Sequence, residues 1–292
     1  MSLPDGNPRI PEGINARNDH PLREFLILAA GISGALVALV LVLGLTAKLI
    51  APYIPFSWEL SAAPSMQDLL AGDDADPGAA RALSALSNSL LQSSLKVPVN
   101  GKDPKDVAPP EHFRFSLVKL DYPNAFATLG AQIAVTEALL QHVSSENGLA
   151  MVLAHEIAHV QLRHPIEAAG RGIVVQIALA ALLGDSSANL LGGSLSTGSM
   201  LTLLSFNRDM ELQADRRALD ILRAHYGHVG GADEFFLDMA ADPHSADWLE
   251  FAQTHPSSKR RLQLIRQAIR EDGPGDATVA LPEALQPNQP LQ

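Results

Sequence analysis

The chain has 292 residues, of which 47% are hydrophobic and 5% aromatic, and its formal net charge is −11. This length and hydrophobic content allow one or two domains with a buried core and exclude wholesale disorder. The acidic balance leaves no basic stripe for phosphates, so we expect no nucleic-acid partner. The sequence contains no cysteine, which excludes disulfides, thiolate metal sites and a cysteine nucleophile.

The first long apolar stretch predicts a membrane anchor. Residues 1–22 are polar and predicted to be a disordered tail, whereas residues from Phe25 to Ala47 carry no charge. As a helix this stretch spans about 34 Å, enough to cross a hydrocarbon core of about 30 Å. A cleaved signal peptide has a shorter apolar run with a small-residue cleavage site close behind it. We therefore predict one uncleaved transmembrane helix over 23–50, through which the chain contacts membrane lipid.

The charges on either side of this stretch give its orientation. Arg9, Arg17 and Arg23 precede it, and Lys48 follows it closely. Basic residues are retained on the cytoplasmic side of a membrane. This bias predicts a cytoplasmic N-terminus and a translocated remainder.

The rest of the chain alternates between helical and strand-like patterns. Residues 51–111 are predicted to be a linker and helical lead-in that ends in a loop over 98–111. Strands are expected at 113–118 and over 125–135, where Gly130 interrupts the pattern. Residues 273–292 are Pro-rich and acidic and are predicted to be a flexible tail. Helices are predicted at 79–95, 145–164, 173–183, 199–204, 207–226 and 258–271.

The helix predicted over 145–164 carries the clearest chemical signal. Ser144 or Ser145 caps its start, and Pro165 is expected to end it. Within it, residues 155–159 match the pattern His-Glu-x-x-His. Residues i and i+4 lie above each other on a helix, so both imidazoles reach one tetrahedral ion. Glu156 lies about 100° around the helix, where it can take a proton from a metal-bound water. The pattern predicts a site for one Zn²⁺ per chain with His155 and His159 as ligands.

A catalytic zinc site of this kind needs a third protein ligand. The longer motif with a third histidine would require glycine at 162 and histidine at 165, where Leu162 and Pro165 stand. His164 is one residue short and fits a residue at the end of a helix. Glu167 is a rival ligand, but it follows Pro165 on the same segment and is poorly placed to close the site from the opposite side. A carboxylate from another helix is therefore expected.

Glu211 is the carboxylate that best meets this requirement. Glu211, Asp215, Ala218 and Leu222 follow helical spacing, so they share one face. Two buried carboxylates require a cation, although a solvated face paired with neighbouring arginines is the alternative. With Glu211 on zinc, Asp215 is expected to accept the free ring N–H of a ligating histidine.

Four blocks of sequence resemble the HtpX and CAAX-prenyl-protease-type zinc metallopeptidases, which are gluzincins. The blocks run from Asn124 to Arg261 and comprise Asn124-Ala125-Phe126-Ala127, residues 152–160, residues 208–215, and Thr254-His255-Pro256 with Arg261. Ala158 replaces a glycine common in the family's zinc motif. The single anchor resembles the envelope members rather than the multi-span ones. The resemblance implies an α+β fold, with a mostly helical zincin-like domain over 112–272 and a small β-sheet.

The resemblance also implies roles for two further groups of residues. Asn124, Ala125, Phe126 and Ala127 would form a strand edge above the cleft, where an extended substrate pairs with backbone groups. His255, with Arg261, would take part in catalysis by polarising the scissile carbonyl or stabilising the oxyanion. Alternatively, His255 is only a loop residue before Pro256.

These observations favour a membrane-anchored zinc endopeptidase that cuts unfolded or membrane-associated polypeptides in envelope protein quality control. Its expected location is a bacterial inner membrane with the catalytic domain in the periplasm. The alternative is a catalytically weak, chaperone-like or substrate-binding module, against which the intact Glu156 argues. A purely structural zinc site is disfavoured because such sites close with four protein ligands, mostly cysteines.

Overall fold

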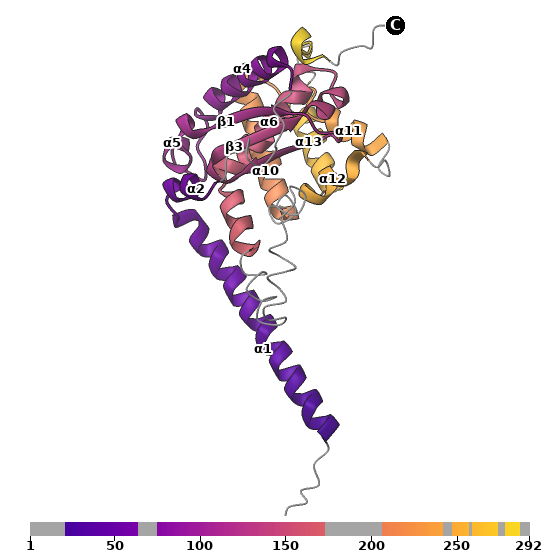
Figure 1. Cartoon of the computed structure of the whole chain (residues 1–292). Coiled ribbons are helices and arrows are strands. Elements are labelled where there is room, and N and C mark those ends of the chain that lie inside the picture. The colour runs from indigo at the N-terminus through magenta and orange to yellow at the C-terminus, as the bar shows by residue number, and fades with distance from the viewer. Residues whose placement is uncertain are drawn as a thin grey trace, which may run out of the picture.

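The computed structural model describes residues 21–63, 75–172, 206–241, 247–256, 259–273 and 278–286. The buried helices expected at 173–183 and 199–204 and residues 1–20 of the tail expected over 1–22 lie outside these ranges, whereas residues 21 and 22 begin the first helix. Within them the chain forms a mostly helical domain with one small sheet and a long N-terminal helix (Figure 1). The fold is therefore α+β, as predicted.

Helix α1 (Pro21–Ile50) extends away from the domain (Figure 1). By length and composition, its stretch Pro21–Thr46 could cross a membrane. The most apolar 18 residues of this stretch include no buried residue. The predicted anchor thus forms one continuous helix that the rest of the protein leaves uncovered. The short helix η1 (Ala51–Tyr53) and helix α2 (Phe56–Ala62) connect it to the domain.

The sheet has three strands in the order β1–β3–β2. Strand β1 (Arg114–Val118) pairs in parallel with β3 (Gln132–Thr136), and β2 (Ala125–Thr128) pairs antiparallel with β3, with Ala125 opposite Val135. The break expected at Gly130 is real, because this residue has φ +72 within the turn η3 (Leu129–Ala131). Strand β2 is left as an edge strand on the side of the sheet next to helix α6.

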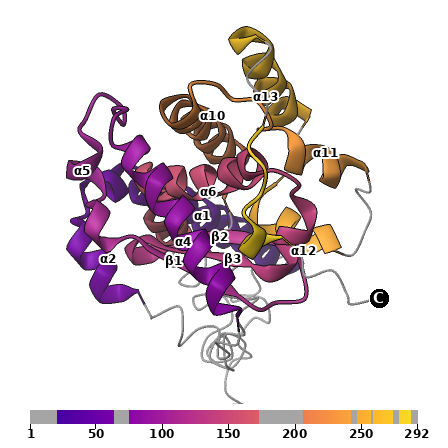
Figure 2. The same cartoon turned by 90° about the horizontal axis from the view of Figure 1, so that it is seen from above.

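Three helices form the body of the domain. Helix α6 (Glu146–Gln161) packs against α4 (Pro77–Ser94), α10 (Arg208–Tyr226) and strand β2 (Figure 2). Each start is capped by a side chain, since Asp76 accepts from the N–H of Ala79, Ser145 from that of Gly148, and Asn207 from that of Met210. Because α4 packs into the same core as α6 and α10, the expected lead-in helix is part of the domain.

Helix α6 ends earlier than the sequence predicted. It stops at Gln161, and Arg163 then adopts φ +65. A second helical segment begins at residue 164 and runs to 172. Pro165 lies in the first turn of this segment, where its missing N–H costs nothing. The expectation that Pro165 ends the first helix was therefore wrong, because the reversal at Arg163 ends it.

The remaining described elements surround this body. Two short turns, α5 (Pro104–Val107) and η2 (Pro110–His112), occupy the stretch expected to be a loop. Helices α11 (Glu234–Ala241), α12 (Asp247–Thr254) and α13 (Lys259–Asp272) follow α10. The helix expected at 258–271 corresponds to α13.

Residues 278–286, which the sequence analysis assigned to a flexible tail, instead pack against the domain. Ala280 forms a β-bridge with Ser145, and the N–H of Glu146 donates to the Val279 carbonyl at 2.9 Å. Leu281 and Leu285, on either side of the start of η5 (Glu283–Leu285), are buried in the main core. This strap therefore secures the first turn of α6, the helix that carries the His-Glu-x-x-His pattern.

Candidate metal centre

Helix α6 brings its two histidines to one point. The His155 and His159 Nε2 atoms are 3.0 Å apart, and both side chains are buried. The helix can hold this pair rigidly because the strap and the Ser145 cap fix its first turn and its other faces lie in the core. The i, i+4 spacing therefore places two imidazole nitrogens side by side, as the sequence indicated.

Helix α10 supplies the carboxylates from the opposite side. The two Glu211 oxygens lie 3.4 Å from His155 Nε2 and 3.4 Å from His159 Nε2, respectively. Asp215, one turn further on, places Oδ1 3.0 Å from His155 Nδ1. Glu211 thus lies among the ring nitrogens that converge, and Asp215 lies behind the ring of His155.

Arg261 of α13 compensates these two buried acids. Its Nε and Nη2 contact the two oxygens of Asp215 at 2.7 and 2.8 Å, and its Nη1 lies 2.5 Å from Glu211 Oε2. Burial alone would raise the pKa of Glu211, but His255 and Arg261 hold it well below its usual range. Similarly, the pKa of Asp215 is lowered by Arg261 despite burial. Both acids therefore carry negative charge in the interior.

The same acids act on the histidines. Burial disfavours a charged His155, but the contacts with Asp215 and Glu211 outweigh it and raise its pKa to about 9. For His159 burial dominates, and its pKa lies well below the usual value. A neutral His159 presents a lone pair suited to a metal ion.

Glu156 lies beside this cluster rather than in it. It is buried, its Oε1 is 3.7 Å from His255 Nε2, and its Oε2 has no hydrogen-bond partner among the described residues. Burial raises its pKa, against the opposing effect of His255 and His155. Such a carboxyl group is suited to taking up and releasing a proton.

His255, which follows α12, also belongs to the cluster. Its Nδ1 lies 3.3 Å from Glu211 Oε1, and its Nε2 lies 3.1 Å from the carbonyl oxygen of Ala125. One donor atom each from His155, His159, Glu211 and His255 lie within 4.8 Å of one another. The ring of His255 therefore lies between the other three donor side chains and strand β2. His255 thus belongs to the site and is not a loop residue remote from it.

The strand expected to bind substrate borders the site but is not open to solvent. Asn124 and residues 125–127 are buried, and the Ala125 carbonyl on the outer edge is engaged by His255. The side-chain amide of Asn124 has no hydrogen-bond partner within the described part of the chain.

His164 is a functional candidate that sequence reasoning set aside. Its Nδ1 lies 2.9 Å from His159 Nδ1, and both rings are buried. Burial lowers the pKa of His164 to about 3, so the ring is neutral and can accept a hydrogen bond. On a continuous helix residue 164 would point away from residue 159; the reversal at Arg163 brings it back. His164 thus contacts Nδ1 of His159, just as Asp215 contacts Nδ1 of His155.

Phe206 was also missed. Its ring stacks on His159 with centroids 3.8 Å apart and an angle of 16° between the planes. It immediately precedes Asn207, the cap of α10, so the start of this helix holds both Phe206 and Glu211 near the histidines. An aromatic residue just before a helix cap carries no metal-site signal in the sequence.

Two other features of the structure lie away from the cluster. The rival ligand Glu167 contacts Arg171 at 3.3 Å and is not among the four clustered donors.

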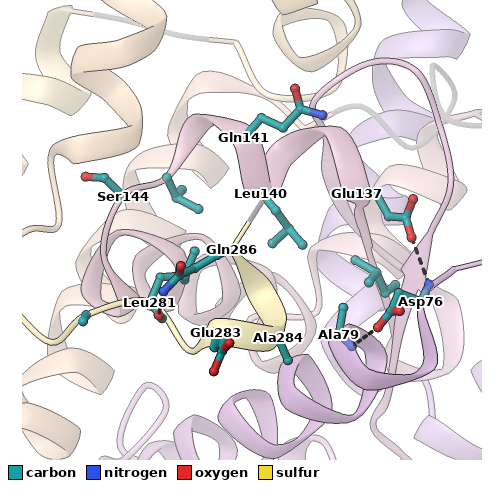
Figure 3. Close-up of a pocket in the computed structure, with 13 residues that line it drawn as sticks. Asp76, Ala79, Glu137, Leu140, Gln141, Ser144, Leu281, Glu283, Ala284 and Gln286 are labelled. Carbon is teal, nitrogen blue, oxygen red and sulfur yellow. Dashed lines mark hydrogen bonds between the residues drawn. The ribbon is translucent and has the colours of Figure 1, made fainter. Parts of the chain in front are cut away.

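A cavity of about 1060 Å³ opens between the strap, the start of α4 and the turn η4 (Glu137–His142). Figure 3 shows the residues that line it. Its acidic wall serves the fold, because Glu137 accepts from the Asp76 N–H and Asp76 caps α4.

Two histidines one helical turn apart, a carboxylate from a second helix and an acid beside them define the site of a metallopeptidase. The distances fit one ion, because a tetrahedron with bonds of about 2.0–2.1 Å has edges of about 3.3 Å. The separations of 3.0, 3.4 and 3.4 Å among His155, His159 and Glu211 are close to that value.

Comparison with known proteins gives the family. Residues 96–269 match the model of peptidase family M48, and the chain belongs to this family. The mitochondrial metalloendopeptidase OMA1 of Schizosaccharomyces pombe is 38% identical over 152 residues, which are 51% of this chain and 44% of that protein. The beta-barrel assembly-enhancing proteases of Yersinia pestis and Escherichia coli K12 are 31% and 30% identical over 174 residues, 56% of this chain and 35% of each relative. The chain therefore matches less than half the length of these relatives.

The position of His164 leads to a prediction about metal affinity. His164→Ala should leave the Nδ1–H of His159 without its acceptor, and loss of such a partner typically weakens metal binding by about 10–100-fold. Zn²⁺ titration against a competing chelator measures this, with thermal unfolding as a check on folding. His228→Ala is the control, since His228 accepts from the N–H of Gly230, contacts the ring of Tyr226 and is not among the four clustered donors. Unchanged affinity in His164→Ala, or complete loss of metal, would contradict a positioning role.

Proposed function

We propose that this protein is a membrane-anchored, zinc-dependent endopeptidase that hydrolyses peptide bonds of unfolded or membrane-associated polypeptides. The observation that carries the proposal is the convergence of His155, His159 and Glu211 on one point, with Glu156 beside it. Two imidazoles and one carboxylate are the ligand set of many catalytic zinc sites, which keep one position open.

The charge of the site supports a divalent cation. Glu156, Glu211 and Asp215 contribute −3 when ionised, and Arg261 contributes +1. Without a metal, His155, whose pKa is raised to about 9, carries a further +1. A metal ion bound to His155 replaces that proton, and the acids and the guanidinium then leave −2. Burying uncompensated charge costs several kcal/mol per ion. A divalent ion would cancel this charge. Histidine nitrogen and carboxylate oxygen suit zinc better than calcium or magnesium, which prefer oxygen alone.

The mechanism assigns different tasks to the surrounding residues. A zinc ion held by His155, His159 and Glu211 would polarise the scissile carbonyl and acidify a water molecule. Glu156 takes a proton from the attacking water and delivers it to the leaving amine. His255, close to Glu156, is placed to donate to the developing oxyanion once it releases the Ala125 carbonyl. Asp215 orients the ring of His155, and His164 orients the ring of His159.

Substrate binding is proposed for strand β2. Its outer edge faces the site at Ala125, and the buried amide of Asn124 offers a donor NH₂ group and an acceptor oxygen to a peptide backbone. An extended substrate would lie antiparallel or parallel to this edge and replace the His255 contact. Because the site residues are buried, polypeptide entry requires movement of the elements that cover them.

The relatives support the choice of substrate class. One group bears the name metalloendopeptidase and the other the name beta-barrel assembly-enhancing protease. Cleavage of proteins at a membrane, including a role in envelope quality control, is therefore the physiological setting that we propose for this chain.

Removal of the proposed base tests the function most simply. Glu156→Gln should lower hydrolysis of an unfolded protein such as casein by about 10²–10⁴-fold, because general acid–base catalysis is lost. The variant should still bind about one zinc per chain, since all three ligands remain. Glu167→Gln, which changes an acid outside the cluster, should retain full turnover. Normal turnover in Glu156→Gln would rule out the mechanism.

We also propose that the catalytic domain lies across a bacterial inner membrane from residues 1–22. The arginines at positions 9, 17 and 23 and the continuous helix α1 support this orientation. The chain has no cysteine, so single substitutions report the side directly. A membrane-impermeant maleimide applied to intact spheroplasts should label Ser89→Cys, on the exposed face of α4, and should label Ser2→Cys only after lysis. The reverse pattern would invert the orientation.

A further inference from the structure

The segment that joins the anchor to the domain has an unusual surface. Between Lys48 and Asp68 the chain carries a single charged residue, Glu59. In the described part of this stretch two aromatic side chains are exposed, Tyr53 at 82% and Trp58 at 68%. By contrast, Trp248, the other tryptophan of the chain, is only 4% exposed. A water-facing linker would be expected to carry charges and small polar residues instead.

The single charge of this segment is turned inward. Glu59 is 3% exposed, and its Oε1 lies 2.7 Å from Nη1 of Arg163, which lies just after the end of α6. The N–H of Gly130 donates to the other oxygen of Glu59 at 3.4 Å. Arg163 in turn donates to the carbonyl of Ile54 at 2.5 Å and lies over the ring of Phe56 at 5.3 Å.

These contacts make the segment a rigid part of the domain. Breaking a buried ion pair by removing one partner is strongly destabilising, so the Glu59–Arg163 pair holds helix α2 firmly against the end of α6. Residues 54–59 are therefore clamped, whereas Tyr53 and Trp58 are left uncovered. Their exposure is not the result of a loose connection to the domain.

The position of the segment along the anchor indicates what covers the two aromatic rings. The span Pro21–Thr46 has 26 residues and is about 39 Å long as a helix, longer than a hydrocarbon core of about 30 Å. The residues that directly follow this span therefore lie in the headgroup layer. With its headgroup layers included, a bilayer is about 40–45 Å thick. Figure 1 shows α2 at the end of α1 where the helix meets the domain.

Tryptophan and tyrosine are the side chains that favour this layer, because each combines an apolar ring with a polar group. We propose that residues 51–62 form a juxtamembrane foot whose Tyr53 and Trp58 lie in the lipid headgroup region. The surface is continuous with the exposed apolar surface of α1 and has no outward charge. The proposal rests on the membrane anchoring proposed above and is independent of peptidase activity.

The foot sets where the active site operates. It is clamped to Arg163, and Arg163 follows the helix that carries His155 and His159. The metal centre is thus held at a fixed distance from the bilayer surface, because a rigid segment and not a flexible linker connects it to the anchor helix. Polypeptide segments that leave the membrane or lie close to its surface are the substrates that this arrangement favours.

Tryptophan fluorescence tests the foot directly. In Trp248→Phe, Trp58 is the only tryptophan of the full-length chain, which is reconstituted into phosphatidylcholine vesicles. Lipids with a spin label near the headgroup should quench Trp58 at least about twofold more than lipids labelled near the chain end, since the ring lies in the interface. Aqueous acrylamide should quench it less than it quenches free tryptophan.

The matched control is Trp58→Phe, in which the buried Trp248 should respond to neither lipid quencher. If Trp248→Phe does not fold, the Trp58 signal follows from the wild-type signal minus that of Trp58→Phe. Strong acrylamide quenching without lipid quenching would place Trp58 in water and overturn the proposal. Protection from every quencher would mean that a protein surface covers Trp58, and would overturn it too.

Casein digestion by the wild-type chain in the same vesicles separates this proposal from the proposed function. Digestion of casein without quenching of Trp58 by the labelled lipids would contradict the proposed foot and leave the peptidase proposal intact. Lipid quenching without digestion defeats the peptidase alone.

Discussion

The structure depends on how three carboxylates are buried together. Glu156, Glu211 and Asp215 lie in the interior around two histidines, where an uncompensated charge costs several kcal/mol. Arg261 compensates both acids of α10 with one guanidinium group. The remaining negative charge is offset by a proton on His155, whose pKa is raised to about 9, or by a divalent cation that would replace this proton. The packing of α6, α10 and α13 is arranged around this balance, because each of the three helices contributes a charged or ligating group to it. The proposed metal site is in this sense part of the core of the domain.

The reversal of the chain at Arg163 connects this core to the segment that follows helix α1. With φ +65 at this residue, His164 turns back onto His159, and the guanidinium of Arg163 reaches Glu59 beyond α1. A helix that continued to residue 164 would lose both contacts. Orientation of the proposed ligand His159 and attachment of the proposed juxtamembrane foot therefore depend on the same local conformation. Movement of the domain relative to the anchor would act directly on the end of the ligand-bearing helix.

Local periodicity predicted the parts of the site that lie within one helix. The i, i+4 rule placed His155 beside His159 and put Glu211 and Asp215 on one face of α10, and the apolar run predicted α1. It could not predict His164, because periodicity does not signal the reversal at Arg163, a residue whose side chain pairs with Glu59 far away in the sequence. Residues 278–286 were misjudged because they lie within the Pro-rich stretch 273–292, although Leu281 and Leu285 at i, i+4 spacing were a signal of burial. The depth at which strand β2 is buried likewise depends on tertiary packing.

The central claim is that Glu211 binds the metal while Asp215 only orients His155. Zn²⁺ titration of Glu211→Ala and Asp215→Ala against the wild type tests it most directly, with thermal unfolding to show that both variants fold. Glu211→Ala should fail to hold zinc stoichiometrically, because two histidines remain as the only proposed ligands. Asp215→Ala should still bind about one zinc per chain with an affinity about 10–100-fold weaker. Retention of tight zinc binding in Glu211→Ala together with its complete loss in Asp215→Ala would contradict the account.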